Sequence, residues 1–283
     1  DVPNSTTANT TMSGTSMAAP VVSGVAALVL EEANTRNIAM SPAAMKALLI
    51  QTAQDVQGTG QATVGPDYAT GWGIVDAEAA VNLLRFGLPP HGLPVPGLPQ
   101  RSRGLVQGTI RAAKGFGDPP AWTQTFTVPA GLPEIHFTLA WDDPAGAPGG
   151  QILVNDLDLR LIAPDGTVFT PWTLNPANPG QAAVRNGGND AVNNVEQVSV
   201  LNPMEGVWTV RVSADRGNLR SVPPAQSFAV AGPRRPVPPS RREQAGLAGD
   251  EFDLACAFDP NCRLAELLPE LIILRCEEIP CTF

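Results

Sequence analysis

Long apolar runs, positive charge and histidine are all scarce in this sequence, and each shortage limits what the chain can be. The longest apolar run, residues 17–30, is interrupted by Pro20, Ser23 and Gly24 and is too short for a bilayer span, so we expect no membrane span. Only 18 lysines and arginines stand against 27 acidic residues, and the net charge of −9 argues against a nucleic-acid partner. With only His91 and His136 present, an imidazole base has two candidates.

Charged residues of either sign are also few, at 16%, whereas the chain contains 29 prolines and 27 glycines. This composition indicates a turn-rich protein with much β-structure. The 283 residues suffice for one large or two medium domains, and 43% hydrophobic residues can supply a core. The first residue is Asp and no signal peptide is visible. We therefore expect a chain that lacks its natural N-terminus.

One stretch organises the N-terminal part: residues 14–20 read Gly-Thr-Ser-Met-Ala-Ala-Pro and precede an apolar helix that should end near residues 34–37. Gly14 permits a tight turn, and Ser16 falls at the first helical residue, where the amides lack partners and the helix dipole is positive. We expect Pro20 in the first turn and the helix, apolar on nearly every face, to be buried. A fixed serine beside free amides suits an acyl-transfer nucleophile; the alternative is a plain N-cap serine.

The residue sequence at 14–20 resembles the nucleophile motif of the subtilisin-like serine proteases. The resemblance implies that Ser16 is the nucleophile of a Ser-His-Asp triad and that its backbone N–H helps form the oxyanion hole. Residues 41–53, with Ser41 as N-cap and Pro42 as the first helical residue, resemble the subtilase helix beside it. Asp76 follows two glycines and could be a triad acid, but we expect it to cap a helix running through Leu84.

After residues 87–103, a Pro/Gly-rich linker, the hydrophobic period changes from helical to two-residue. Alternation is clearest over residues 125–128, 134–141, 157–161 and 208–212, which predicts half-buried strands of an antiparallel sandwich or jelly roll at residues 104–232. In 134–141 the polar face should hold Glu134, His136, Thr138 and Ala140. Sequences such as Asn-Asp-Leu-Asp-Leu at 155–159 resemble the C-terminal β-barrel of alkaline subtilases of the KP-43 type, akin to the P-domain of proprotein convertases.

Oxygen-bearing side chains near the strands suggest a cation site. Asn155, Asp156 and Asp158 lie beside one predicted strand and Asp142 follows another, and hard oxygen ligands suit calcium. The alternative is that these residues are solvated strand edges and turns. The resemblance to calcium-binding barrels favours a structural calcium ion, for which Asp142, Asn155, Asp156 and Asp158 are the candidate ligands.

These observations divide the chain into four parts. Residues 1–86 are predicted to be the C-terminal part of an α/β subtilisin-like catalytic domain, followed by the linker, the all-β jelly-roll domain and a flexible tail, residues 233–283. All four cysteines, Cys256, Cys262, Cys276 and Cys281, lie in that tail. Their spacing fits no common zinc site; two disulfides in a secreted protein or four free thiols remain open.

The predicted function is therefore a secreted serine endopeptidase that acts on proteins or peptides. By the resemblance, the triad Asp and His and the oxyanion Asn precede the serine, so the upstream part of the same protein is required and this chain alone should be inactive. Neither His91 nor His136 is placed by that pattern to serve Ser16. The alternative is an extracellular binding or adhesion module in which Ser16 is vestigial.

Overall fold

The computed structural model describes residues 13–56, 65–86, 104–112, 120–146, 153–185, 189–214, 219–221 and 224–232. Three helices come first: α1 (Thr15–Thr35), α2 (Pro42–Thr52) and α3 (Ala77–Phe86). Eight strands follow, in the order β1 (Leu105–Arg111), β2 (Ala121–Val128), β3 (Glu134–Trp141), β4 (Asp158–Ile162), β5 (Val168–Phe169), β6 (Val195–Leu201), β7 (Gly206–Ser213) and β8 (Ala225–Ala231).

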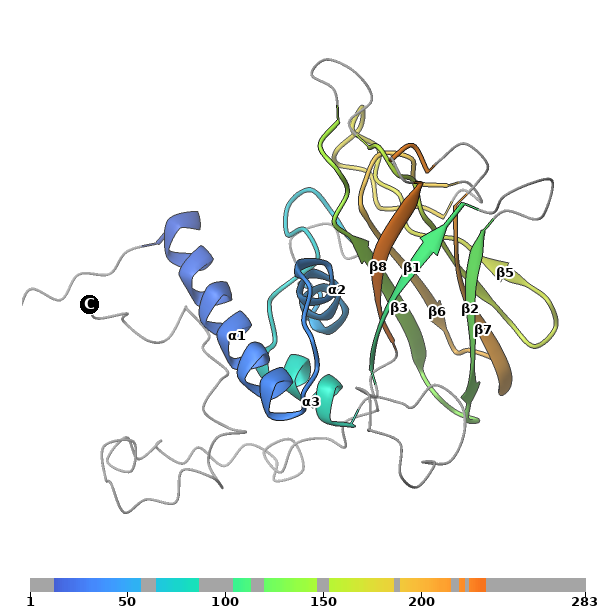
Figure 1. Ribbon diagram of the computed structural model, residues 1–283, viewed down its shortest axis with the longest axis horizontal. Coiled ribbons are helices and arrows are strands. Elements are labelled where there is room, and N and C mark those ends of the chain that lie inside the picture. Colours follow the sequence, from blue (N-terminus) through green and yellow to red (C-terminus); the bar gives the residue numbers. More distant parts are fainter. Residues whose placement is uncertain are drawn as a thin grey trace, which may run out of the picture.

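The strands form two antiparallel four-stranded sheets that face each other (Figure 1). One has the order β1-β8-β3-β6 and the other β2-β7-β4-β5. The final strand, β8, thus lies between β1 and β3, and Leu139 is paired with Val230 on one side and Glu196 on the other. The strands predicted from alternation are all present, and the predicted bounds of β3 match the observed ones.

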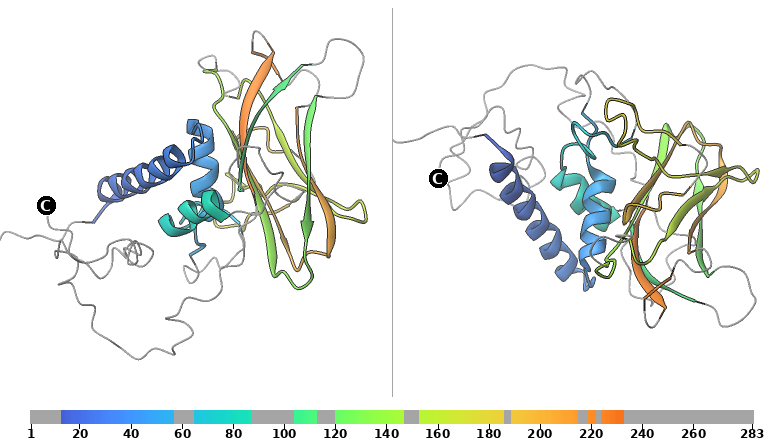
Figure 2. Two further views of the ribbon diagram at one scale, coloured as in Figure 1. Left: turned by 60° about the horizontal axis from the view of Figure 1, so that its bottom comes forward. Right: turned by 90° about the horizontal axis from the view of Figure 1, so that it is seen from above.

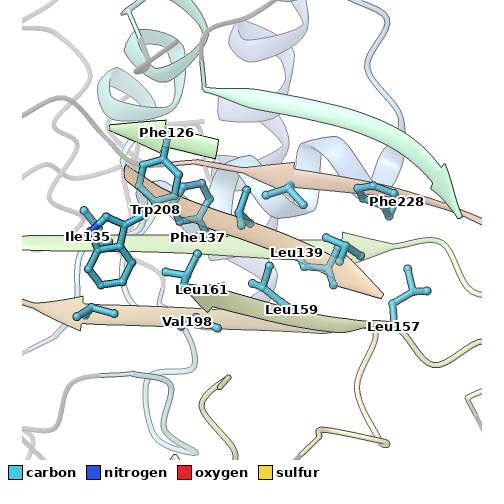
Figure 3. Close-up of a cluster of buried hydrophobic side chains, with 14 of the residues drawn as sticks. Phe126, Ile135, Phe137, Leu139, Leu157, Leu159, Leu161, Val198, Trp208 and Phe228 are labelled. Atoms are coloured by element: carbon cyan, nitrogen blue, oxygen red, sulfur yellow. The ribbon is translucent and has the colours of Figure 1, made fainter. Parts of the chain in front are cut away.

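A hydrophobic core fills the space between the sheets (Figure 3). Strand side chains alternate between the two faces, so the apolar members of each strand point inward together. The rings of Phe126 and Phe137 lie 4.8 Å apart between centroids, and Trp208 packs against Phe169 at 5.7 Å. Burying each large side chain stabilises the fold by about 1.5–3 kcal/mol, so this core is a major source of the sandwich's stability.

Helix α2 lies on the outer face of the β1-β8-β3-β6 sheet, directly on β3 and β8, and α3 packs between α2 and α1 (Figures 1 and 2). Small residues on the sheet, Ala140, Ala229 and Ala231, allow α2 to approach closely, and all three are buried. The predicted polar face of β3 is therefore not solvated along its whole length, since Thr138 and Ala140 are fully buried beneath α2. The alternation of polar and apolar residues predicts which face of a strand each side chain occupies. It does not predict whether a helix covers that face.

Both predicted helix caps are confirmed. The side chain of Ser41 accepts a hydrogen bond from Ala44 N at 3.1 Å, with Pro42 as the first residue of α2. Asp76 Oδ1 accepts from Ala79 N at 2.7 Å at the start of α3, and its Oδ2 accepts from Gln54 Nε2. Asp76 is thus engaged as a helix cap, the interpretation that the sequence favoured.

The course of α1 differs from the prediction in two ways. The helix begins at Thr15, so Pro20 is its sixth residue and lies inside the helix instead of in the first turn. Most of the helix surface is exposed, and its buried residues are Val25, Val29, Glu32 and Ala33, all in its C-terminal two-thirds. A helix that is apolar all round needs partners on every side, and the described residues cover one side near its C-terminal end.

By length and composition alone, α1 could also cross a membrane. Core helices of soluble proteins pass the same test, and part of α1 packs on α3. The helix spans 21 residues because residues 15–16 and 31–35 extend the apolar run, residues 17–30, from which we expected no membrane span. That expectation stays a prediction.

Candidate active-site serine and the groups around it

Ser16 is the second residue of α1 and is exposed. Gly14, the N-cap, has φ 151° and ψ 167°, a conformation that a residue with a side chain adopts only under strain. Met17 N and Ala18 N both donate to Gly14 O, at 3.0 and 3.2 Å. Helix geometry gives the amides of Thr15 and Ser16 no carbonyl partner inside the helix. An anion beside Ser16 would therefore meet N–H donors and the positive end of the helix dipole.

Pro20 bears on the same turn. Its nitrogen carries no hydrogen, so it cannot donate to the carbonyl of Ser16, four residues earlier, and its ring crowds that carbonyl. One turn further on, Ser23 Oγ donates to Ala19 O at 3.1 Å. The first two turns of α1 are thus held by fewer regular helix hydrogen bonds than the rest of the helix.

Within the described residues, Glu32 is the charged anchor of α1. Its Oε2 accepts from Arg85 Nη2 of α3 at 2.7 Å, and its Oε1 accepts from Arg36 Nε of its own helix. The hydrogen bond from Arg85 is the main cause that lowers the pKa of the Glu32 carboxyl, against the opposing effect of burial. The same bond raises the pKa of Arg85.

His136 is engaged at the interface between β3 and α2. Its Nε2 lies 2.8 Å from Gln51 O at the end of α2, and its Nδ1 lies 3.7 Å from Glu134 Oε1. Ser16 is at the far end of α1, the helix that extends away from the sheets in all views (Figures 1 and 2). The structure does not bring His136 to Ser16, in agreement with the expectation from the sequence. His91 lies outside the described residues.

Gln51 is the centre of the contact between the helices and the sheet, and sequence reasoning missed it. Its side chain is fully buried, and its Nε2 donates to His136 O at 2.8 Å and to Gly232 O at 2.9 Å. Its Oε1 accepts from Thr138 Oγ1 at 2.8 Å. The available signal was a single amide on the apolar face of α2, next to Leu48 and Thr52.

Two of the four predicted calcium ligands are occupied by hydrogen-bond donors. Asp142 Oδ2 accepts from Ala43 N at 3.1 Å, so it caps the N-terminus of α2 from the sheet. Asn155 Oδ1 accepts from Arg220 N and Ser221 N at 2.8 and 3.1 Å, and its Nδ2 donates to Gln226 Oε1 at 2.7 Å. Asp142 and Asn155 thus accept hydrogen bonds from backbone N–H groups, and Asn155 also donates one to the buried side chain of Gln226.

The other two predicted ligands, Asp156 and Asp158, are buried, and Asp158 lies near Glu196 of β6, which was not among the predicted ligands. Asp158 pairs with Arg160 at 3.5 Å. Glu196 Oε2 accepts from Leu159 N at 2.5 Å, while its Oε1 is buried without a partner among the described residues. Burial is the main cause that raises the pKa of Glu196 well above its ordinary value, and the charge of Asp158 adds to it.

The described side chains do not by themselves form a complete calcium site. Over the described ranges, no three acidic, histidine or cysteine side chains come together in a way that could hold a metal ion. Residues 147–152 and 186–188, close in sequence to these residues, lie outside those ranges, as do the four cysteines. Calcium binding stays a prediction.

A serine in the first turn of an apolar helix, beside amides without helical partners, is an arrangement suited to hydrolases that use a serine nucleophile. Residues 2–73, which contain this turn, match the subtilase family, Peptidase_S8. An extracellular basic protease of Dichelobacter nodosus is 46% identical over 71 residues, which make up 25% of this chain and 11% of that protein. These matches support the subtilase family for this segment and a serine protease at family level.

The chain therefore spans about a ninth of the length of that relative. Among solved structures, the propeptide form of the lipase BlEst2 of Bacillus licheniformis matches 50% of this chain and 22% of its own. Its TM-score is 0.25 and its sequence identity 15%, values too low to support an argument about fold.

Proposed function

We propose that Ser16 is the acyl-enzyme nucleophile of a secreted, subtilisin-like serine endopeptidase that hydrolyses peptide bonds in proteins or peptides. The observation that carries the proposal is the position of the Gly-Thr-Ser-Met-Ala-Ala-Pro stretch. It lies inside the segment that matches the subtilase family and forms the first turns of α1. Secretion is supported by the relative in Dichelobacter nodosus, which is an extracellular protease. The comparisons do not favour the alternative of a binding or adhesion module.

In the proposed reaction, Ser16 Oγ attacks the scissile carbonyl carbon and gives its proton to a histidine base. The carbonyl oxygen becomes an oxyanion, which the N–H of Ser16 and the N-terminal end of α1 stabilise. The base returns the proton to the leaving amine as the acyl-enzyme forms, and water then hydrolyses the ester. Rigid placement of Oγ is needed throughout, because misplacement by about 1 Å can cost ~10²-fold in rate.

The proposal requires a histidine and a carboxylate that the described part of the chain does not bring to Ser16. We propose that a segment preceding residue 1 supplies them, as the resemblance to subtilases implies. His136 is unsuited to the role, because its Nε2 is held at Gln51 O.

We further propose that the two sheets form the P-domain-like jelly roll of the KP-43 type. The support is the topology, in which β1-β8-β3-β6 faces β2-β7-β4-β5 across one hydrophobic core. In this proposal the jelly roll supports the catalytic helices through α2.

Labelling with a serine-directed fluorophosphonate tests the function. The protein is expressed as residues 1–283 and again with whatever residues the gene encodes before Asp1. We expect the longer form to be labelled and to cleave casein, Ser16→Ala to lose both, and residues 1–283 alone to do neither. Ser23→Ala is the matched control, since Ser23 lies exposed on the same helix and bonds only Ala19 O among the described contacts.

Full labelling of the Ser16→Ala variant would overturn the assignment of the nucleophile. Cleavage by residues 1–283 alone, lost on Ser16→Ala, would show that a histidine of this chain serves as base and that the upstream segment is not required.

A further inference from the structure

The helix that carries Ser16 is fixed to the rest of the described protein near one end. Its fully buried residues are Val29 and Ala33, which pack in the cluster formed with α2, α3 and the sheet. Val22 and Leu30 are 39% and 42% exposed. Figures 1 and 2 show the N-terminal half of α1 extending away from α2 and α3. Among the described residues, the buried contacts of α1 thus begin at Val25, about two and a half turns from Ser16, and are complete only at Val29 and Ala33.

The strongest directional contact in that region is the ion pair between α1 and α3. The Glu32 side chain is 8% exposed, and its two oxygens are held by different arginines, Arg85 of α3 and Arg36 one turn along α1. Apolar contacts such as those of Val29 and Ala33 allow a helix to roll or tilt, whereas charge-assisted hydrogen bonds fix a direction. Because Arg85 belongs to the last turn of α3, the pair locks one end of α1 against one end of α3.

The distance along the helix amplifies any change at this anchor. Ser16 and Glu32 are 16 residues apart, so at 1.5 Å per residue the serine lies about 24 Å from the carboxylate along the axis. A tilt of about 5° around the anchor would move Ser16 by roughly 2 Å over that length. Displacements of about 1 Å at a reacting atom are enough to cost ~10²-fold in rate.

We propose that Glu32, held by Arg85, is a positioning residue for the Ser16 nucleophile: the ion pair sets the direction of α1 and thereby the place of the serine hydroxyl. This inference rests on the proposed function for its effect on catalysis. Its structural part concerns the direction of α1 and does not depend on activity.

The structural part is tested in residues 1–283 by measuring a distance between α1 and the sandwich. Spin labels are introduced through a non-natural amino acid at Ala19 and Thr127, both exposed, so that the four cysteines stay untouched. We expect a narrow distance distribution for the wild type and a broad or shifted one for Glu32→Gln and Arg85→Gln. Arg85→Lys, which keeps the charge, should restore most of the narrow distribution. Glu31→Gln, one residue away and exposed, is the matched control and should match the wild type.

The catalytic part is tested in the longer, active form. We expect Glu32→Gln and Arg85→Gln to lower kcat by about tenfold or more with little change in KM, since Glu32 lies about 24 Å along α1 from the reacting serine. If Glu32→Gln does not fold, Arg85→Gln carries the test, because the Arg85 side chain is 42% exposed and tolerates replacement better.

An unchanged distance distribution in both variants would overturn the proposal, as would an unchanged kcat in an active enzyme. If the wild-type protein shows neither labelling nor turnover in any form, the proposed function fails, and the distance measurement still decides whether Glu32 directs α1.

Discussion

Replacing Gln51 should reveal whether the helices and the sandwich melt as one unit. In Gln51→Ala, three hydrogen bonds are lost: two from Nε2 to His136 O and Gly232 O and one from Thr138 Oγ1. At about 1 kcal/mol each, the free energy of unfolding should fall by about 3 kcal/mol. The loss could be larger, because the partners stay buried and the side chain leaves a cavity. For a protein of this size, 3 kcal/mol corresponds to a fall in Tm of roughly 6–12 °C.

Two further variants separate hydrogen bonding from packing. Gln51→Met fills a similar volume without a donor and should cost nearly as much as Gln51→Ala if the hydrogen bonds dominate. Lys46→Ala, at an exposed position of the same helix, should change the free energy of unfolding by less than about 0.5 kcal/mol. Urea and thermal unfolding followed by circular dichroism and tryptophan fluorescence give the values.

The reasoning would be refuted if Gln51→Met were as stable as the wild type. It would also be refuted if the two probes melted at different temperatures in the wild type, since the helices and the sheets would then unfold separately.

Three other predictions can be checked with the same methods. Folding raises the pKa of Glu196, so the stability that the protonated carboxyl contributes is complete at a pH below the unfolded pKa and is lost as the pH rises through the folded pKa. In the presence of a chelator, the Tm of the wild type should fall over that pH range, and the Tm of Glu196→Gln should fall less. Calcium should raise Tm, because a cation that binds only the folded state stabilises it by mass action; equal Tm in calcium and in chelator would contradict this. Residues 104–232 should fold alone around the core between the sheets, with a lower Tm than the whole chain because Ala140 loses the cover of α2; an unfolded spectrum would exclude it.

Local patterns in the sequence predicted the three helices and four of the eight described strands, β2, β3, β4 and β7. Ser41 and Asp76 begin helices because their side-chain oxygens accept hydrogen bonds from first-turn amides. In both cases the donor and the acceptor lie within four residues of each other in the sequence. The alternation in β3 likewise predicted which side chains face the opposite sheet, with Phe137 and Leu139 buried there. Both signals arise from the backbone period and from groups adjacent in sequence.

What the sequence could not predict depends on residues distant in the chain. Gln51 in α2 is bound by the carbonyls of His136 and Gly232, and Asp142 caps α2 instead of lying free for a cation. No short pattern encodes such pairings. Pro20 was misplaced because even a helix that starts at Ser16 has Pro20 as its fifth residue, beyond the first turn; the observed start at Thr15, after Gly14, makes it the sixth.

The position of β8 between β1 and β3 has a consequence for how the protein is made. The hydrogen bond between Gln51 and Gly232 joins residues 181 apart, and β8 completes both the sheet and the surface on which α2 rests. At about 5–20 residues per second, a ribosome needs roughly 10–35 s to synthesise that interval. Until β8 is made, α2 has only part of its docking surface, and β1 and β3 each present an open edge. The sheet β1-β8-β3-β6 can therefore form only after the last strand has been synthesised, and a chain truncated before β8 cannot complete it.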